Sequence, residues 1–110
     1  MKINLDKGDG VLVHSNEKYD VIDNTDLNNL IVSKTILHPG KETGGHNHTG
    51  QEEVYIFEEG SGVMQVGEEK FLVSKGSIVL IPDGAFHKVW NTSKYEDLIF
   101  ICVFDGGRNH

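Results

Sequence analysis

The chain has 110 residues and a net charge of −7, from 10 lysines and arginines against 17 aspartates and glutamates. This length has room for one domain, and an acidic chain with a single arginine lacks the basic patch that nucleic-acid binding needs. One cysteine permits no internal disulfide, which is typical of the reducing cytoplasm. The longest apolar run, Leu98–Phe104, is too short to cross a bilayer, and no signal-peptide pattern precedes it. We therefore expect a cytoplasmic single domain over residues 1–110 that binds neither nucleic acid nor membrane.

Short apolar runs alternate with turn residues along the chain. Runs rich in Val, Ile, Leu and Phe predict β-strands at Val11–His14, Tyr19–Ile22, Leu30–His38, Glu53–Phe57, Val63–Val66, Phe71–Ser74, Ser77–Ile81, His87–Asn91 and Leu98–Phe104. Glycine-containing turns such as Asp9-Gly10 and Asp83-Gly84 separate them. No window of helical length has an apolar stripe of helical period. This pattern predicts an all-β sandwich or barrel.

Three histidines and one glutamate have spacings that can bring them to one point. His46 and His48 are two residues apart, so on a strand both imidazoles would leave the same face. Glu53 opens the next apolar run after a short glycine-containing bend, and His87 begins a strand just past the turn Pro82-Asp83-Gly84. Three neutral imidazoles and one carboxylate suit a divalent first-row metal, and we predict such a site here.

The same residues stand in two longer motifs. The first runs Gly40-x5-His46-x-His48-x4-Glu53-x6-Gly60, and the second runs Gly76-x5-Pro82-x-Gly84-x2-His87-x3-Asn91. In this order they resemble the two motifs of the cupins, and the 15 residues between them match the spacing of small microbial cupins. The resemblance implies a double-stranded β-helix (jelly-roll) barrel, with motif one at residues 40–60 and motif two at 76–91. The chain also resembles the small single-domain type-2 cupins often labelled mannose-6-phosphate isomerase-like, a label that implies little about substrate.

The expected cofactor is one divalent transition metal held by His46, His48, Glu53 and His87. Four protein ligands leave one or two open positions for a small molecule. Manganese, iron, nickel and zinc all remain open, because ligand type alone does not rank them. One glutamate against a divalent ion leaves a net positive site, which favours anionic or oxygen-rich ligands. Neither motif contains a cluster of arginine and lysine, so a phosphorylated sugar is less attractive than a neutral or singly charged ligand.

Strand alternation predicts which other side chains face the metal. If Glu53 faces it, Tyr55 does too. Tyr55 is either a packed aromatic or, as our candidate catalytic residue, an acid/base group whose pKa the metal would lower. On the long strand before motif one, either Ser33 and Thr35 face inward or, in the other register, Lys34 does.

Four further residues have simpler interpretations. His38 precedes Pro39, where extended backbone is expected, and we interpret it as a strand-end residue rather than a ligand. His14 and His110 match no motif position and are expected at the surface. Cys102 has no histidine partner by spacing, so we expect a small buried hydrophobe rather than a nucleophile.

A homodimer is the expected assembly. If His87 faces inward, Asn91 does as well and Trp90 points outward. Both faces of Leu98–Phe104 are apolar and must be covered. The barrel interior covers one face, and the other needs a second sheet or a second subunit. A second subunit would cover the rest, with the strand around Val11–His14 at the interface.

The cupin resemblance stops short of an activity, because this scaffold serves isomerases, lyases, dioxygenases, decarboxylases, storage proteins and ligand sensors. Our first hypothesis is a metalloenzyme with isomerase, lyase or oxygenase chemistry on a small oxygenated metabolite. The alternative is a non-catalytic, metal-dependent module that binds or senses a small molecule. An attached DNA-binding domain would favour sensing, and none is recognisable in this sequence, which favours the enzyme.

Overall fold

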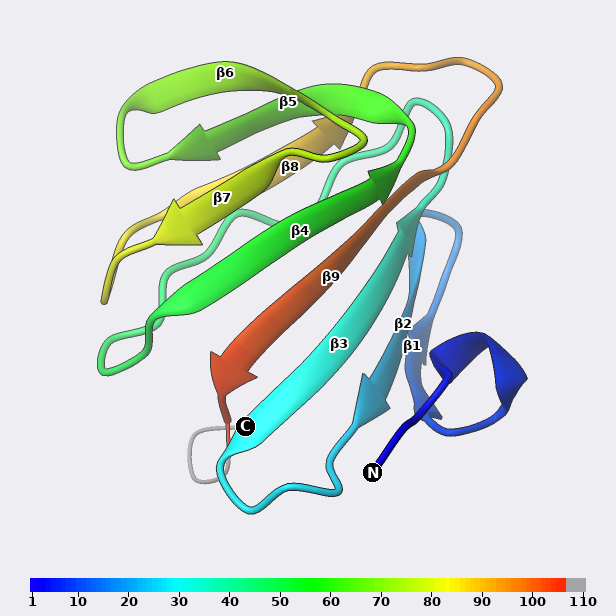
Figure 1. Ribbon diagram of the computed structural model, residues 1–110. Coiled ribbons are helices and arrows are strands. Elements are labelled where there is room, and N and C mark those ends of the chain that lie inside the picture. The colour runs from blue at the N-terminus through cyan, green and yellow to red at the C-terminus, as the bar shows by residue number, and fades with distance from the viewer. Residues whose placement is uncertain (107–110) are drawn as a thin grey trace.

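The computed structural model describes residues 1–106, which form two antiparallel β-sheets (Figure 1). Within these residues the strands are β1 (Val11–Ser15), β2 (Tyr19–Asn24), β3 (Leu30–Leu37), β4 (Glu53–Glu59), β5 (Ser61–Val66), β6 (Glu69–Ser74), β7 (Ile78–Ile81), β8 (His87–Asn91) and β9 (Leu98–Asp105). The all-β prediction is therefore confirmed. A 3-10 turn that the sequence did not predict, η1 (Leu5–Lys7), precedes β1. Across the described part of the chain, no helix has the length and apolar character needed to cross a membrane.

The two sheets differ in size and enclose one core. The large sheet has the order β1-β2-β3-β9-β4-β7, and the small one has the order β6-β5-β8. β9 comes last in the chain but lies between β3 and β4 (Figure 1). Every second residue of β9 is buried, while those between are half-buried. Phe57 of β4 and Phe100 of β9 are each 1% exposed, and their ring centroids lie 5.1 Å apart. Burying each such side chain contributes about 1.5–3 kcal/mol.

The tight connection between β4 and β5 depends on one glycine. Gly60 has φ 86°, a left-handed conformation that side-chain-bearing residues rarely adopt. A Cβ at this position would also lie 2.5 Å from the backbone oxygen of Asp97. Gly60 closes the first motif, and its place in the motif therefore has a structural reason: the chain turns sharply here from the large sheet into the small one.

The register of β3 decides which of its polar residues face the interior. Ser33 and Thr35 line the cavity described below, so the first of the two predicted registers is the one present. Lys34 points to the other face, where its Nζ lies 2.7 Å from Asp6 Oδ1 and 3.6 Å from Glu58 Oε2. These contacts hold η1 against the outside of the large sheet.

The surroundings of Trp90 remove one argument for a second subunit. Trp90 alternates with the buried residues Val89 and Asn91 on β8, as expected, but its side chain is half-buried rather than fully exposed. The Nζ atoms of Lys70 and Lys88 lie 4.8 and 5.2 Å from its ring centroids. These two cation–π contacts lie on the half-buried ring, so Trp90 does not by itself require a partner subunit.

Candidate metal centre

The segment between β3 and β4 carries two of the predicted ligands and runs alongside β8. Thr43 N donates to Val89 O at 2.9 Å, and Asn91 N donates to Lys41 O at 2.8 Å. Further along the same two segments, His46 and His87 form an isolated antiparallel bridge. His46 and His48 therefore lie on an irregular segment outside the strands, so the strand alternation by which we reasoned for this pair does not apply; only single bridges join the segment to β8.

Glycine gives this segment room beside the turn before β8. A Cβ on Gly45 would lie 2.3 Å from Cζ of Phe86, whose ring packs across the glycine. The next residue is His46, so this close approach brings the segment, and the imidazole that follows, against the start of β8.

His46, Glu53 and His87 come together in the folded chain. One potential ligand atom from each lies within 4.8 Å of the others. His87 Nε2 lies 3.0 Å from Glu53 Oε2. Glu53 is 6% exposed and His87 is 1% exposed, whereas His46 is exposed towards the mouth of the site. Three strands or segments that are separate in sequence therefore present two nitrogens and one oxygen to a common point.

Backbone carbonyls set the tautomer of two of these histidines. His46 Nδ1 lies 3.0 Å from Gly44 O, and His87 Nδ1 lies 3.0 Å from Ala85 O. A carbonyl oxygen can only accept, so in each ring Nδ1 carries the proton and donates it. The Nε2 lone pairs of both neutral rings are then directed away from these carbonyls. This carbonyl anchoring is the usual second contact of a metal-binding histidine.

His48 is the fourth predicted ligand and lies beside the other three. Its ring centroid is 4.7 Å from that of His46 and 6.2 Å from that of His87. The group of three residues whose ligand atoms lie within 4.8 Å of one another does not include His48. Burial and the neighbouring His46 lower the pKa of His48, which favours the neutral ring that a metal requires.

The pKa values of the buried pair Glu53 and His87 are shifted in opposite directions. Burial alone would raise the pKa of Glu53, but His87, His48 and His46 more than offset this and lower it. Burial alone would lower the pKa of His87, but the Glu53 carboxylate and the Ala85 carbonyl raise it. Each residue therefore favours the charged form of the other, so Glu53 is held as a carboxylate beside the imidazoles.

One buried atom of this site has no hydrogen bond. Among the described residues, His87 Nε2 is fully buried and makes no hydrogen bond of acceptable geometry, although Glu53 Oε2 is only 3.0 Å away. A buried polar atom without a partner is costly and calls for an explanation. Both residues belong to the group of three whose potential ligand atoms lie close together, so an ion bound among them would supply the missing partner. The donor set and the unsatisfied nitrogen therefore fit a divalent transition metal.

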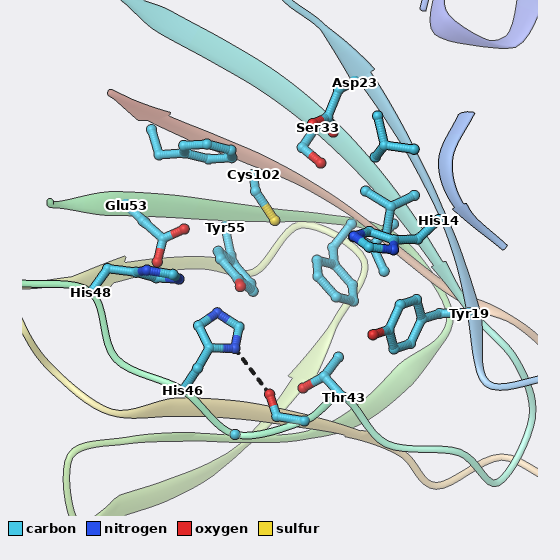
Figure 2. A pocket seen from close by; sticks show the side chains of 17 residues that line it. His14, Tyr19, Asp23, Ser33, Thr43, His46, His48, Glu53, Tyr55 and Cys102 are labelled. Carbon is cyan, nitrogen blue, oxygen red and sulfur yellow. Dashed lines mark hydrogen bonds between the residues drawn. The ribbon is translucent and has the colours of Figure 1, made fainter. Parts of the chain in front are cut away.

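The site opens into a cavity of about 660 Å³ within the barrel (Figure 2). His46, His48 and Glu53 lie on one side of it, and His14, Tyr19, Asp23 and Ser33 lie on the other. Val21, Phe100 and Phe104 add apolar surface. A mostly apolar cavity with a few polar anchors is typical of a small-molecule site.

Tyr55 lines the cavity close to the three ligands, as strand alternation predicted. Its ring stacks on Phe100 with centroids 5.1 Å apart and meets His87 edge-on at 5.7 Å. Burial, with Cys102 and Glu53 nearby, raises the pKa of Tyr55 well above its ordinary value. In the protein without metal its hydroxyl is therefore neutral and can donate a proton. Cys102 is buried beside it, and burial raises the pKa of its thiol, as suits a small hydrophobe.

Other histidines and Asn91 divide between structural roles and the cavity wall. His38 lies between Asp20 and Asp97, at 3.5 and 3.2 Å, and not at the site. Asn91 is 3% exposed and donates to the backbone oxygens of Leu37 and Glu96 at 2.9 and 2.8 Å. It therefore holds chain segments together, although it belongs to the second motif. His14 is exposed as expected, but it also lines the cavity mouth. His110 lies outside the described residues.

Sequence reasoning also missed Tyr19 and Asp23 as cavity residues. Both belong to β2, where Tyr19, Val21 and Asp23 alternate onto the inner face. This alternation is visible in the sequence, but nothing there shows that β2 pairs with β3 and so extends the cavity wall.

Comparison with known proteins identifies a family model and relatives. Residues 33–104 match the model of the Cupin domain. MJ1618 from Methanocaldococcus jannaschii is 34% identical over 73 residues, which are 66% of this chain and 58% of that protein. The chain therefore spans less than two thirds of the length of this relative.

Two solved structures share the whole fold. TT1209 from Thermus thermophilus has 30% identity and a TM-score of 0.80, covering 96% of this chain and 97% of that one. A Klebsiella pneumoniae protein described as having a double-stranded β-helix domain has 21% identity and a TM-score of 0.82, covering 99% of this chain and 92% of that one. These likenesses confirm the predicted double-stranded β-helix.

Proposed function

We propose a metal-dependent function on the premise that the chain belongs to the cupin family, as its match over residues 33–104 establishes. The proposed cofactor is one divalent transition ion bound by His46, His48, Glu53 and His87. The proposed activity is isomerase, lyase or oxygenase chemistry on a small oxygenated metabolite. The observation that carries the proposal is the buried Nε2 of His87, which makes no hydrogen bond and lies 3.0 Å from Glu53, a residue that lines a cavity of about 660 Å³.

The chain's own groups would divide the work around the ion. When bound, such an ion supplies Lewis acidity towards a ligand oxygen or, if it is iron, activation of dioxygen. The carbonyls of Gly44 and Ala85 hold two imidazoles in the tautomer that leaves Nε2 available. Tyr55 presents a neutral hydroxyl next to the same position and can donate a proton to a bound ligand.

A non-catalytic binding or sensing module is the second candidate, and one observation favours it. An efficient acid/base group has a pKa near the operating pH. The pKa of Tyr55 is shifted away from that range by burial. If no other group moves a proton, the site would hold a ligand without converting it.

Homodimer formation also remains a proposal. Val11, Leu12 and Val13 of the edge strand β1 are 67%, 58% and 45% exposed. Apolar side chains on an unpaired strand edge favour association with another chain. The mass in solution, from light scattering coupled to size-exclusion chromatography, tests this proposal, and a monomer at micromolar concentration would contradict it.

The function is tested with protein purified without a polyhistidine tag. Elemental analysis, before and after reconstitution, is expected to find about one transition ion per chain, and a value near zero after reconstitution would refute the metal site. The loaded protein is then screened against small acids and sugars while oxygen consumption and product formation are recorded. Product formation supports the enzyme, whereas binding without conversion supports the module.

A further inference from the structure

A row of polar residues crosses the large sheet beneath the cavity. Asp23 of β2 pairs with Ser33 of β3, Ser33 with Cys102 of β9, and Cys102 with Tyr55 of β4. All four residues line the same cavity as His46, His48 and Glu53, three of the proposed ligands. Residues opposite each other on neighbouring strands share a face, so the row runs from a position beside Glu53 to the far wall. Figure 2 shows Asp23 and Ser33 at that wall, across the cavity from Glu53 and His48.

One oxygen of the Asp23 carboxylate has no partner among the described residues. This Oδ1 atom is fully buried and accepts no hydrogen bond, and none of the lysine, arginine or histidine side chains that the structure describes forms an ion pair with the carboxylate. An ionised carboxylate only accepts hydrogen bonds, and leaving it unpaired in a cavity wall is costly. Rotation about its terminal torsion is soft, so either oxygen can turn towards the cavity.

The Asp23 charge reaches into the cavity. It contributes, after burial and the Glu53 charge, to raising the pKa of Cys102, which lies two strands away in the row. Ser33 is 5% exposed and presents its hydroxyl beside Asp23. A carboxylate and a hydroxyl together favour a ligand group that donates a hydrogen bond, and they disfavour a second anion.

We propose that Asp23 and Ser33 form a second polar subsite, which binds a hydroxyl or amino group of the ligand whose other end binds the metal. This inference rests on the proposed function and narrows its substrate class. The metal end selects a carboxylate or another anionic oxygen, and the Asp23 end selects a hydrogen-bond donor. The ligand is therefore a small acid with a donor group several bonds from its carboxylate, and not a diacid.

The sheet geometry bounds the length of such a ligand. Asp23 and Tyr55 are three strands apart, which is about 14 Å along the sheet at ~4.8 Å per strand. A metal–oxygen bond of ~2 Å and a hydrogen bond of ~3 Å occupy the two ends. Since the sheet curves around the cavity, the ligand itself spans roughly 8 Å or less, which is about the length of an extended six-carbon acid measured from its carboxylate oxygen to a donor atom on its last carbon.

Three six-carbon acids test the subsite on protein loaded with zinc, which is redox-silent. Calorimetric titrations compare 6-hydroxyhexanoate and 6-aminohexanoate with hexanoate, which has the same length and lacks the donor. The wild-type protein is expected to prefer one donor-bearing acid over hexanoate by about tenfold or more, the effect of a hydrogen bond to a charged group. Whether the hydroxyl or the amine gives the larger preference identifies the donor.

The variants assign the preference to its residue. In Asp23→Ala the preference is expected to disappear, while zinc content and hexanoate affinity stay at their wild-type values. In Asp23→Asn a hydroxyl preference persists in part, whereas an amine preference is lost with the charge. Asp20→Asn, the same change on β2 at a residue outside the cavity lining, is the matched control and keeps the full preference.

Failure of the subsite and failure of the metal function give different results. Equal affinities for the three acids in the wild type, or a preference that survives in Asp23→Ala, would overturn the subsite and leave the metal site standing. If none of the acids binds the zinc-loaded protein at millimolar concentration, the subsite is likewise overturned and the metal site stands. If the protein takes up no zinc at all, the proposed function fails, and the subsite fails with it.

Discussion

His46 and His87, which lie in different motifs, are joined through their backbones as well as gathered at one site. His87 N donates to His46 O at 2.9 Å, and His46 N donates to His87 O at 3.2 Å. Each ring also donates its Nδ1 proton to the carbonyl two residues before it. The backbone bridge thus fixes the separation of the two rings, and the carbonyls fix their orientation, before any ion arrives. Such preorganisation reduces the cost of binding a metal.

Loss of a ligand should reduce metal content without unfolding the protein. We expect Glu53→Gln and His46→Ala to weaken metal affinity by at least the ~10–100-fold typical of losing even an outer contact. Metal content is measured by elemental analysis after dialysis against a weak chelator. His38→Ala is the control, because His38 contacts Asp20 and Asp97 away from the site and should keep the full metal load.

Acid should release the metal. Ligation needs neutral imidazoles, and free histidine titrates near pH ~6.5, so protons compete with the ion as the pH falls. We expect release below about pH 5.5, since binding depresses the apparent pKa of the ligands. Metal content after dialysis across this range is the measurement. A full load retained at about pH 4 would contradict histidine ligation.

The protein stripped of metal should show a different pH dependence. The pKa of Glu53 is lowered from 4.5, so its contribution to stability is present above that value and is lost in stronger acid. The pKa of His87 is raised from 6.5, so its contribution is present below that value and is lost as the pH rises through the folded pKa. The pair therefore stabilises most between these two values. Urea unfolding in the presence of EDTA should give a larger free energy at about pH 5.5 than at about pH 8.

Two variants separate the contributions to that profile. His87→Gln removes the titrating ring and should flatten the difference between the two pH values. The lowered pKa of His48 acts in the opposite sense, so His48→Gln should enlarge it. An unchanged profile in His87→Gln would show that the Glu53–His87 pair does not govern the stability of the metal-free protein.

Tyr55→Phe tests the candidate acid/base group. The change keeps the ring that stacks on Phe100, so fold and metal content should survive. If Tyr55 donates a proton during turnover, the rate on an identified substrate should fall by ~10²–10⁴-fold. Turnover equal to that of the wild type would make Tyr55 a packed aromatic and nothing more. Phe57→Leu, one inward position further along β4, controls for general disturbance of the core.

Asn91→Ala should destabilise the fold while leaving the site's ligands in place. The Asn91 amide donates to the backbone oxygens of Leu37 and Glu96, and its oxygen accepts from Ser93 N at 2.9 Å. Removing it leaves a buried carbonyl unsatisfied, so we expect a loss of roughly 2–4 kcal/mol in the free energy of unfolding. Chemical denaturation measures this loss. Asn28→Ala at an exposed position should change stability little.

Much of the secondary structure could be predicted because it depends on local patterns, and the two motifs indicated that His46, Glu53 and His87 would come together. The nine predicted strands are present, with ends that shift by at most two residues, since period-two alternation is a property of neighbouring residues. Alternation also placed Tyr55 on the face of Glu53. The roles of Trp90 and Asn91 were harder to anticipate, because lysines from two different strands cover the one and distant carbonyls bind the other.

The sequence by itself determined the all-β class, the positions of the strands and the identity of the residues that meet at His46, Glu53 and His87, because spacing and motif order carry that information. Only the tertiary structure decided that His46 lies on an irregular segment bridged to β8, and that Asp23 enters the same cavity as Glu53. Both depend on pairing between segments remote in the chain: 41–46 with β8, and β9 with both β3 and β4, which places β2, the partner of β3, in the same sheet as Glu53. Register between such segments is set by the packing of the whole sheet, which no local pattern encodes.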